Sequence, residues 1–361
     1  MLLGSAGLLL ASPPAQAQGY VEREIMIPWT KAAPNGLDSL LVYVDEPGKH
    51  PLVVLTHGSS RKMEEHAEVT PWAELPQALW FARRGWVALV VVRRGYGHSS
   101  GEQDGRHGGQ CPQTDYEGAA EYSAADLRVA LDYGRALPNV DPEHDIAVGI
   151  STGGMATVAL AAQSPPGLVA AINFAGGRGS KADHYVCNPG DLIKAYRQFG
   201  RTSRIPMLWI YAQNDQYFWP ELAQKFDQAF RSQGGNDEFI LAPPIGDDGH
   251  ALFRHVAAWS DIVDKFLSEH QLVPISQLLP EVQPPNVPAP PGVSEDVQRA
   301  FRNYLILGPH KAFAVSPHHY GFSAAQISAD DARHKALETC EEMTKKQEPC
   351  SIVNVDNAPV P

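Results

Sequence analysis

The chain has 361 residues, of which 43% are hydrophobic and 19% are charged, and its formal net charge is -12. These proportions are ordinary for a folded protein and exclude a globally disordered chain. The negative charge, with no cluster of lysines and arginines, argues against a nucleic-acid partner, because phosphate binding needs a basic face. The length is sufficient for one large domain and a small second one.

The first residues, MLLGSAGLLLASPPAQAQG, combine a short apolar run with small residues at Ala15 and Ala17. This pattern indicates that residues 1–17 are the remnant of a secretory signal peptide, although the usual basic start is missing. A ragged apolar N-terminus of a cytosolic protein is the alternative. No later stretch approaches about 18 uninterrupted apolar residues, so no membrane span is expected. We expect a periplasmic or secreted protein.

Short β-branched runs then alternate with longer amphipathic or alanine-rich segments, as when parallel strands are joined by crossover helices. The predicted strands are Val21–Ile27, Leu40–Val44, Leu52–Thr56, Val87–Val92, Ile146–Ile150, Ala170–Phe174, Met207–Tyr211 and Phe239–Leu241. The predicted helices are Trp72–Arg84, Glu117–Ala136, Thr152–Gln163, Pro220–Gln233 and Ala251–His270. The first two strands alternate in polarity, which favours an antiparallel edge, whereas several others are apolar throughout. The sequence predicts a doubly wound, mostly parallel α/β sheet flanked by helices, in one domain at 20–272.

A proline-rich segment follows this domain, with seven prolines between Pro274 and Pro291. We interpret residues 273–293 as a polyproline-type linker or a strap along the surface. Residues 294–361 return to a folded composition and are expected to form a small α+β domain with one disulfide. Its predicted elements are helix Glu295–Tyr304, strand Lys311–Val315, helix Ala329–Thr344 and strand Ile352–Val355.

Four cysteines form an even set, which indicates two disulfides in an exported protein. Their distribution favours Cys111 with Cys187 and Cys340 with Cys350, because the second pair lies beyond the linker. A zinc site is the weaker alternative, since there is no C-x-x-C spacing and no histidine at ligand spacing. We therefore predict no metal and no organic cofactor.

The segment Gly149-Ile150-Ser151-Thr152-Gly153 matches G-x-S-x-G, with the strand IAVGI before it and the helix MATVALAAQ after it. A serine on so tight a turn is forced towards disfavoured backbone angles, so glycine is needed at 149 and 153. This nucleophile elbow would expose Ser151 at the N-terminus of a helix, whose dipole favours developing negative charge. A glycine-rich turn with an incidental serine is the alternative.

A serine hydroxyl needs a base within hydrogen-bond reach and an acid to orient that base. Asp215 ends the run MLWIYAQND after one predicted strand, and His250 lies in PPIGDDGH after the next. The chain order Ser151, Asp215, His250 is the one that a serine on a strand–turn–helix elbow requires. Asp247 and Asp248 are closer to His250 in the sequence and remain alternatives for the acid, although they follow no strand end.

At this point the chain resembles the α/β-hydrolase superfamily, in particular its dienelactone hydrolase-like and prolyl-oligopeptidase-like serine esterases. The resemblance extends to LVVLTHGSS and to RRGYGHSSG, and it covers roughly residues 21–270. It implies an oxyanion hole formed by the backbone amides of Ser59 and Thr152, while His57 braces its loop. It also implies that Arg93 and Arg94 anchor their turn through salt bridges, with acidic-substrate contact as the alternative.

The interval between predicted strands at residues 174–207 is too short for a large helical cap. If Cys111 pairs with Cys187, two loops would be joined over the active site and would give the pocket a rigid rim. His57, Tyr217, Phe218, Trp219 and Tyr185 are candidate substrate-pocket residues, with core packing as the alternative for the aromatic ones. The C-terminal segment, with KAFAVS and ALETCEEMTKKQEPC, resembles a small domain of some bacterial exported proteins, which assigns no chemistry.

The sequence thus predicts an exported serine hydrolase that cleaves a small-molecule carboxylic ester through an acyl-enzyme on Ser151. A serine peptidase of the prolyl-oligopeptidase type is one alternative, because the same machinery cleaves both bonds. A non-catalytic protein that keeps the hydrolase fold to bind a ligand is the other. The sequence predicts neither the natural ester nor the oligomeric state.

Overall fold

The computed structural model describes residues 19–103, 111 and 114–360. Within them, eight strands form one sheet in the order β1-β2-β4-β3-β5-β6-β9-β10. Their bounds are β1 (Tyr20–Ile27), β2 (Leu37–Val44), β3 (His50–Thr56), β4 (Val87–Val91), β5 (Val140–Ile150), β6 (Leu168–Phe174), β9 (Met207–Ala212) and β10 (Asp237–Ala242). The pairs β1·β2 and β2·β4 are antiparallel and the others are parallel, which confirms the predicted sheet and its antiparallel edge.

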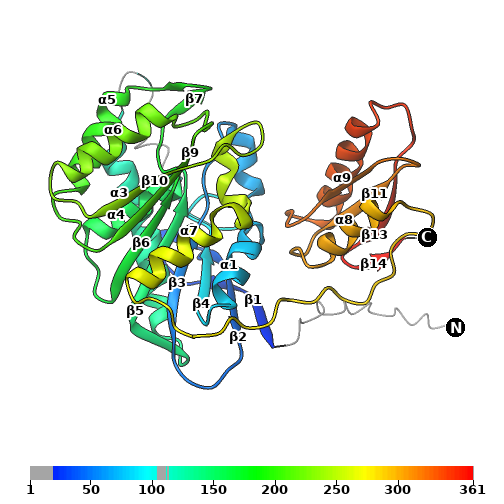
Figure 1. Ribbon diagram of the computed structural model, residues 1–361, viewed down its shortest axis with the longest axis horizontal. Helices are drawn as coiled ribbons and strands as arrows, with labels where there is room; N and C mark the ends of the chain where they lie inside the picture. Colours follow the sequence, from blue (N-terminus) through cyan, green and yellow to red (C-terminus); the bar gives the residue numbers. More distant parts are fainter. Residues whose placement is uncertain (1–18, 104–110, 112–113, 361) are drawn as a thin grey trace, which may run out of the picture.

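Helices cover both faces of this sheet (Figure 1). They are α1 (Leu75–Ala82), α3 (Tyr116–Arg135), α4 (Thr152–Ala162), α5 (Pro189–Phe199), α6 (Pro220–Arg231) and α7 (Val256–Glu269). Buried side chains of α3, α4, α5 and α6 pack on one face, and those of α1 and α7 pack on the other. The two cores explain why the central strands are apolar throughout.

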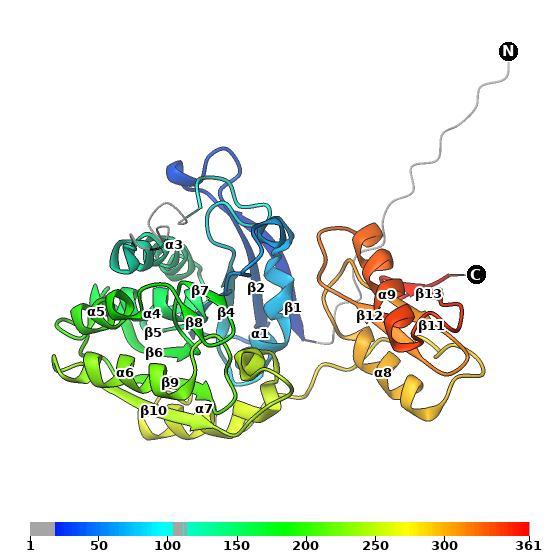
Figure 2. The ribbon, with the colours of Figure 1, turned by 90° about the horizontal axis from the view of Figure 1, so that it is seen from above.

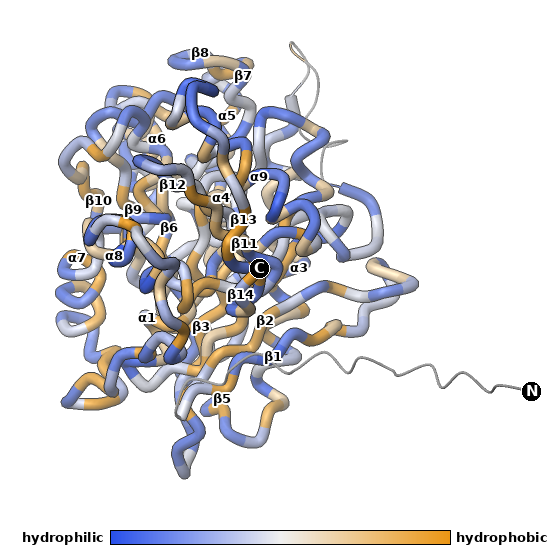
Figure 3. Tube along the Cα trace, turned by 90° about the vertical axis from the view of Figure 1, so that its right-hand side faces the viewer, coloured by the Kyte–Doolittle hydropathy of each residue, from blue (hydrophilic) through white to orange (hydrophobic). Residues whose placement is uncertain are grey.

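Strand β4 illustrates this arrangement, since all five of its residues are buried. Val87, Leu89 and Val91 belong to the core under α3 and α4, while Ala88 and Val90 belong to the core under α1 and α7. The alternation follows from the two-residue period of a strand. Figure 3 shows that residues along the buried strand β3 are hydrophobic, whereas helix α9 (Ala329–Met343) is mainly hydrophilic.

Two helical segments differ from the prediction. The single helix expected over 251–270 is divided into the short 3-10 helix η4 (Gly249–Arg254) and α7, with His255 between them in a non-helical conformation. His250 therefore lies within η4, close to β9, instead of just ahead of a long helix. Helix α5 was not predicted, because the glycine and polar residues at its start hide its amphipathic pattern. Between β6 and α5 lies a small hairpin, β7 (Ser180–Ala182) with β8 (Tyr185–Val186).

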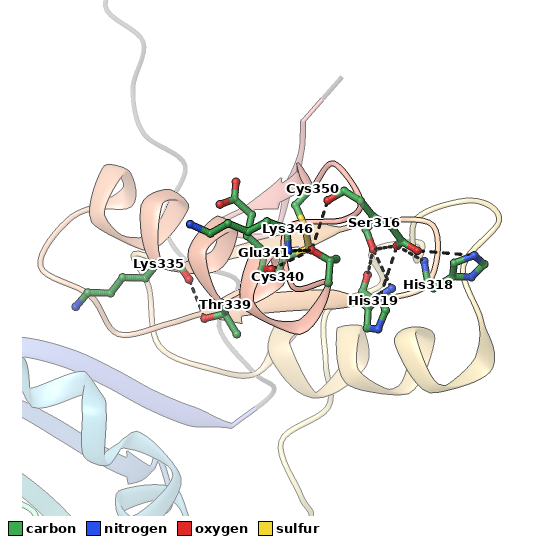
Figure 4. The surroundings of a disulfide bond; sticks show 11 residues. Ser316, His318, His319, Lys335, Thr339, Cys340, Glu341, Lys346 and Cys350 are labelled. Atoms are coloured by element: carbon green, nitrogen blue, oxygen red, sulfur yellow. Dashed lines mark hydrogen bonds and ion pairs between the residues drawn. A yellow bond between two sulfur atoms is a disulfide. The ribbon is translucent and has the colours of Figure 1, made fainter.

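The C-terminal unit is a four-stranded antiparallel sheet in the order β12-β11-β13-β14, covered by α8 and α9. Its remaining elements are α8 (Glu295–Leu305), β11 (Ala312–Val315), β12 (Tyr320–Ser323), β13 (Ser351–Val355) and β14 (Ala358–Pro359). The disulfide Cys340–Cys350 joins α9 to the start of β13 (Figure 4). Nearby, the Ser316 hydroxyl donates to Glu348 Oε2 at 2.8 Å. The predicted α+β unit with its own disulfide is confirmed.

The proline-rich segment runs along the surface of the large sheet domain to the C-terminal unit (Figures 1 and 2). The Leu279 amide donates to the carbonyl of Arg83 at 3.0 Å, and the Arg83 Nε donates back to the carbonyl of Leu279 at 2.7 Å. The Tyr20 hydroxyl donates to the carbonyl of Pro280 at 2.7 Å. The segment is therefore attached as a strap, while the domain limits at residues 272 and 293 remain a prediction.

Candidate active site

Ser151 lies at the sharp turn between β5 and α4, with backbone angles φ 57° and ψ -121°. This conformation is costly for a residue with a side chain, and it persists only where the surroundings impose it. A Cβ on Gly149 would collide with the backbone of Gly153, and one on Gly153 would collide with the carbonyl of His57. Both glycines are thus required by close backbone approach, as the sequence predicted for this turn.

Asp215 follows the end of β9 and its carboxylate is completely buried. Its Oδ1 accepts hydrogen bonds from the amides of Tyr217 at 2.8 Å and Phe218 at 2.9 Å. Its Oδ2 lies 3.1 Å from Nδ1 of His250. The backbone therefore holds one oxygen so that the other faces the imidazole, and Nε2 of His250 is left for a second partner.

Asp248 has a different role from Asp215. Its Oδ1 accepts from the amides of His250 at 2.9 Å and Gln216 at 3.0 Å, which caps η4 and ties this turn to the segment after β9. The Tyr217 ring stacks on the His250 ring, with centroids 4.0 Å apart and an interplanar angle of 8°. Of the three candidate acids, Asp215, Asp247 and Asp248, the one whose carboxylate contacts the His250 ring is Asp215.

The loop after β3 lies directly against the nucleophile turn. A Cβ on Gly58 would lie 3.0 Å from Cβ of Ser151. The hydroxyls of Ser59 and Thr152 share a hydrogen bond of 2.8 Å, so the two predicted oxyanion residues are neighbours. Thr152 is the first residue of α4, where the amide has no partner within the helix.

The side chain of Arg93 packs against the loop after β3 and is 1% exposed. Its guanidinium donates to the Thr56 hydroxyl at 3.0 Å, the Thr152 hydroxyl at 2.9 Å and the carbonyl of His57. The expectation of a salt bridge is therefore wrong for Arg93 in the described part of the chain, where its partners are carbonyls and hydroxyls. It is correct for Arg94, which pairs with buried Asp126 at 2.5 Å.

A cavity of about 830 Å³ opens over these residues and is bordered by both Ser151 and His250. Within residues 19–103, 111 and 114–360, Ser151 Oγ makes no hydrogen bond, so Ser151 and His250 border the same cavity without being hydrogen-bonded to each other. His57 also borders it, but its Nε2 accepts from the Arg93 amide at 3.0 Å. This bond fixes the His57 ring as part of the loop support.

The candidate pocket residues divide into two groups. Tyr217 borders the cavity together with His57. Phe218 is 1% exposed and packs in the core, Trp219 is partly buried against that core, and Tyr185 is 54% exposed; none of these three borders the cavity.

Cys111 and Cys187 form a disulfide with Cα atoms 5.6 Å apart, which confirms the predicted pairing. Neither cysteine borders the cavity, so the disulfide does not form the rim that the sequence suggested. Within the cavity lining, the walls instead come from the segment 60–77, from η4 and from the C-terminal unit. No motif in the sequence predicts that the C-terminal unit contributes to the cavity wall.

The C-terminal unit contributes Ala324, Ala325, Gln326 and Lys335 to the cavity wall. The Thr70 hydroxyl donates to the carbonyl of Ala325 at 2.8 Å, and Lys335 Nζ lies 2.6 Å from Oε2 of Glu68. Figure 2 shows this unit beside α1 and β1. Glu68 ends the short helix η2 (Met63–Glu68) and Thr70 immediately precedes η3 (Pro71–Glu74); residues of both helices also line the cavity.

One cluster in the described ranges brings three possible metal ligands together: Glu24, Asp38 and His98 each have a ligand atom within 4.8 Å of the others. It lies at β1, β2 and the turn after β4, and none of its residues borders the cavity. Separately, no helix among the residues described is both long enough and apolar enough to cross a bilayer.

The sheet order, the serine turn at the end of β5 and the cavity above it define a hydrolase of the α/β-hydrolase fold. The sequence profile of the dienelactone hydrolase family matches residues 74–258, just over half of the chain. The chain belongs to the dienelactone hydrolase family. No curated protein matches its sequence significantly.

Solved structures with the same fold are distant in sequence. An acylaminoacyl peptidase of Pyrococcus horikoshii has 17% identity and a TM-score of 0.50; the match covers 70% of this chain and 42% of the peptidase. An esterase of Pyrococcus furiosus has 16% identity and a TM-score of 0.45, and the match covers 69% of this chain and 92% of the esterase. Acetyl xylan esterase 1 of Thermoanaerobacterium has 14% identity and a TM-score of 0.46, and the match covers 72% of this chain and 89% of that enzyme. At these identities the likeness concerns the fold alone.

Proposed function

We propose that this hydrolase is an exported serine esterase that cleaves carboxylic esters. Ser151 attacks the ester carbonyl, His250 takes the hydroxyl proton and returns it to the leaving alcohol, and Asp215 holds the imidazole. Water then releases the acyl group from Ser151. The observation that carries the proposal is the 3.1 Å contact between Asp215 and His250 at a cavity shared with the strained Ser151.

The amides of Ser59 and Thr152 are proposed to stabilise the oxyanion of the tetrahedral intermediate. Losing one such donor typically raises the barrier by about 3 kcal/mol. Arg93 supports this role because its guanidinium donates to the Thr152 hydroxyl and to carbonyls of the loop after β3. A buried cation in this position favours negative charge nearby, since it has no carboxylate partner among the described residues.

Export is proposed on two features. The chain has two disulfides, which persist in oxidising compartments such as the periplasm and the extracellular space. The signal-like segment 1–17 lies outside the described residues. Expression of the full chain followed by N-terminal sequencing of the periplasmic and secreted fractions tests this part, and recovery of an uncleaved cytosolic protein contradicts it.

A fluorophosphonate probe tests the nucleophile. Wild-type protein is expected to be labelled on Ser151, and Ser151→Ala is expected to lose both the label and esterase activity. Ser268→Ala, on the exposed face of α7, serves as the control and should retain both. A folded wild type that takes no label would contradict the proposal and favour a ligand-binding protein.

Ester and peptide substrates are separated by the leaving group. We expect hydrolysis of 4-nitrophenyl esters from acetate to octanoate, with kcat/KM at least a hundredfold above that for aminoacyl 4-nitroanilides. The opposite ranking would assign the same residues to a peptidase, because the triad chemistry is common to both reactions.

A further inference from the structure

Two residues with a buried side-chain oxygen border the cavity that Ser151 also borders. Glu74 is the last residue of η3 and Gln77 lies in the first turn of α1, and the two are 9% and 2% exposed. In the part of the chain that the structure describes, Glu74 Oε2 and Gln77 Oε1 have no hydrogen-bond partner. Folded proteins rarely leave buried acceptors without donors, so two at one cavity wall indicate a site for a ligand.

The orientation of Gln77 is determined by its neighbour. Its Nε2 donates to the carbonyl of Phe253 at 2.8 Å, and Phe253 belongs to η4, the same short helix as His250. A flipped amide would place two carbonyl oxygens together, so the oxygen of Gln77 has to be the atom without a partner. The unpartnered oxygen of Gln77 is therefore an acceptor, whereas the carboxyl of Glu74 accepts when it is ionised and donates when it is protonated. A complementary ligand presents a group that can both donate and accept.

The surrounding charge distinguishes between kinds of donor. Burial raises the pKa of Glu74 to about 7, and the positive charges of Arg254 and then Arg93 act against that rise. With a pKa of about 7 this carboxyl is about half protonated at neutral pH, so it offers a cationic ligand only part of a negative charge. A hydroxyl group can donate or accept, so it pairs with either form of the carboxyl and adds no charge.

We propose that Glu74 and Gln77 form a subsite for hydroxyl groups of the substrate, so that the enzyme acts on esters of polyols or sugars. This inference rests on the proposed esterase function. A cavity of about 830 Å³ lies within the range of sites that enclose whole small molecules, so it has room for such a group beside the reacting carbonyl. The subsite also lies on the same wall as η4, which links it to the position of His250.

Two esters with the same acyl chain and the same three-carbon alcohol skeleton test the subsite: 2,3-dihydroxypropyl butyrate and propyl butyrate. Wild type is expected to favour the dihydroxy ester in kcat/KM by at least about tenfold. Glu74→Leu is expected to reduce this ratio by about tenfold, the effect of losing one buried hydrogen bond. Glu74→Gln, which keeps a carbonyl oxygen, should restore part of the ratio.

The ratio cancels general effects of the substitution on the reacting groups, and thermal unfolding checks that each variant is folded. Glu221→Leu is the matched control, since Glu221 lies exposed in the first turn of α6; its ratio should equal that of wild type. A wild-type ratio near one, or a ratio that Glu74→Leu does not move, would overturn the subsite. A preference for butyrylcholine over the dihydroxy ester would assign the wall to a cation and would also overturn the proposal.

A binding measurement separates this inference from the proposed function. In the Ser151→Ala protein, tighter calorimetric binding of 2,3-dihydroxypropyl butyrate than of propyl butyrate, lost when Glu74→Leu is added, supports the subsite even if wild type takes no fluorophosphonate label. Equal binding of the two esters overturns the subsite, and it leaves the labelling result and the esterase proposal unaffected.

Discussion

At the scale of single residues, the two aspartates near His250 differ in what their oxygens bind. Asp215 contacts the imidazole and two backbone amides, whereas the partners of Asp248 in the described part of the chain are the backbone amides of Gln216 and of His250 itself. A carboxylate that orients the ring affects the chemical step, and a carboxylate that caps a turn affects the local fold. The two can therefore be distinguished by mutation.

We predict that Asp215→Asn lowers kcat for a nitrophenyl ester by about 10³- to 10⁴-fold, because an amide favours the wrong imidazole tautomer. Asp248→Asn keeps an acceptor oxygen for the two amides and should lower kcat by less than about tenfold. Steady-state kinetics on both variants, with thermal unfolding as a check on folding, measures the difference. Equal losses would indicate that Asp248 shares the orienting role.

Glu74 provides a prediction for stability. Its pKa is about 7 in the folded protein against an ordinary value of 4.5, so the folded state binds this proton more tightly than the unfolded state. The stability that it contributes is complete below about pH 4.5 and is lost as the pH rises through 7. Between pH 6 and pH 8.5 this loss amounts to about 1 kcal/mol.

Glu74→Gln should therefore reduce the fall in unfolding free energy between pH 6 and pH 8.5 by about 1 kcal/mol, measured by urea unfolding at constant ionic strength. Both proteins should still lose some stability over this range through Asp145 and Asp237, because burial raises their pKa values to about 7 and about 8. An identical pH dependence in wild type and variant would show that Glu74 is ionised in the folded protein at pH 6.

At the scale of elements, the junction of β5 and α4 combines a strained serine with glycines that touch neighbouring backbone. The turn also receives hydrogen bonds from outside, since the Ser151 amide donates to the carbonyl of Phe174 at 2.9 Å and the Gly177 amide donates to the carbonyl of Ser151 at 3.0 Å. These bonds to β6 and the loop after it hold the strained conformation. A change at the junction should consequently affect both stability and activity.

We predict that Gly149→Ala destabilises the protein by about 3 kcal/mol or more, because its Cβ would collide with the backbone of Gly153 and that backbone cannot move away. Esterase activity should be lost with it, as the turn shifts. Gly190→Ala is the control, since a Cβ there meets no atom within 4 Å. Denaturant unfolding of both variants gives the comparison, and similar stabilities would contradict close packing at the junction.

At the scale of the whole molecule, the C-terminal unit forms part of the cavity wall through residues far from the serine in sequence. The contacts of Thr70 with Ala325 and of Glu68 with Lys335 connect the two parts of the chain at this wall. The strap adds a second connection through Arg83 and Leu279. The C-terminal unit is thus positioned to limit the size of the substrate, a role that its own motifs do not suggest.

Ala325→Trp should fill part of the cavity from the C-terminal side. We expect kcat/KM for 4-nitrophenyl octanoate to fall at least tenfold, and kcat/KM for the acetate to fall less than about threefold, because the short ester does not reach that wall. Ala358→Trp, on exposed β14, is the control and should change neither value. Equal effects on both esters would show that this wall does not contact the acyl chain.

The sequence alone was sufficient for most of the fold. All eight predicted strands form the large sheet, because their apolar runs reflect burial on both faces, a property of each strand by itself. The turn at Ser151 was likewise predictable, since G-x-S-x-G between a strand and a helix is a local pattern. Helix α5 and the break at His255 were not, because their stability depends on packing against neighbouring elements and not on local periodicity.

What the sequence by itself determined was the type and order of the elements and the placement of Ser151, Asp215 and His250 after strand ends. The tertiary structure decided which side chains meet: Asp215 and not Asp248 reaches the imidazole, Arg93 binds loop carbonyls in place of an acid, and Ala325 joins the cavity wall. The reason is that local patterns depend on residues a few positions apart. Contacts between distant segments depend on how whole layers pack, and no short stretch of sequence encodes that.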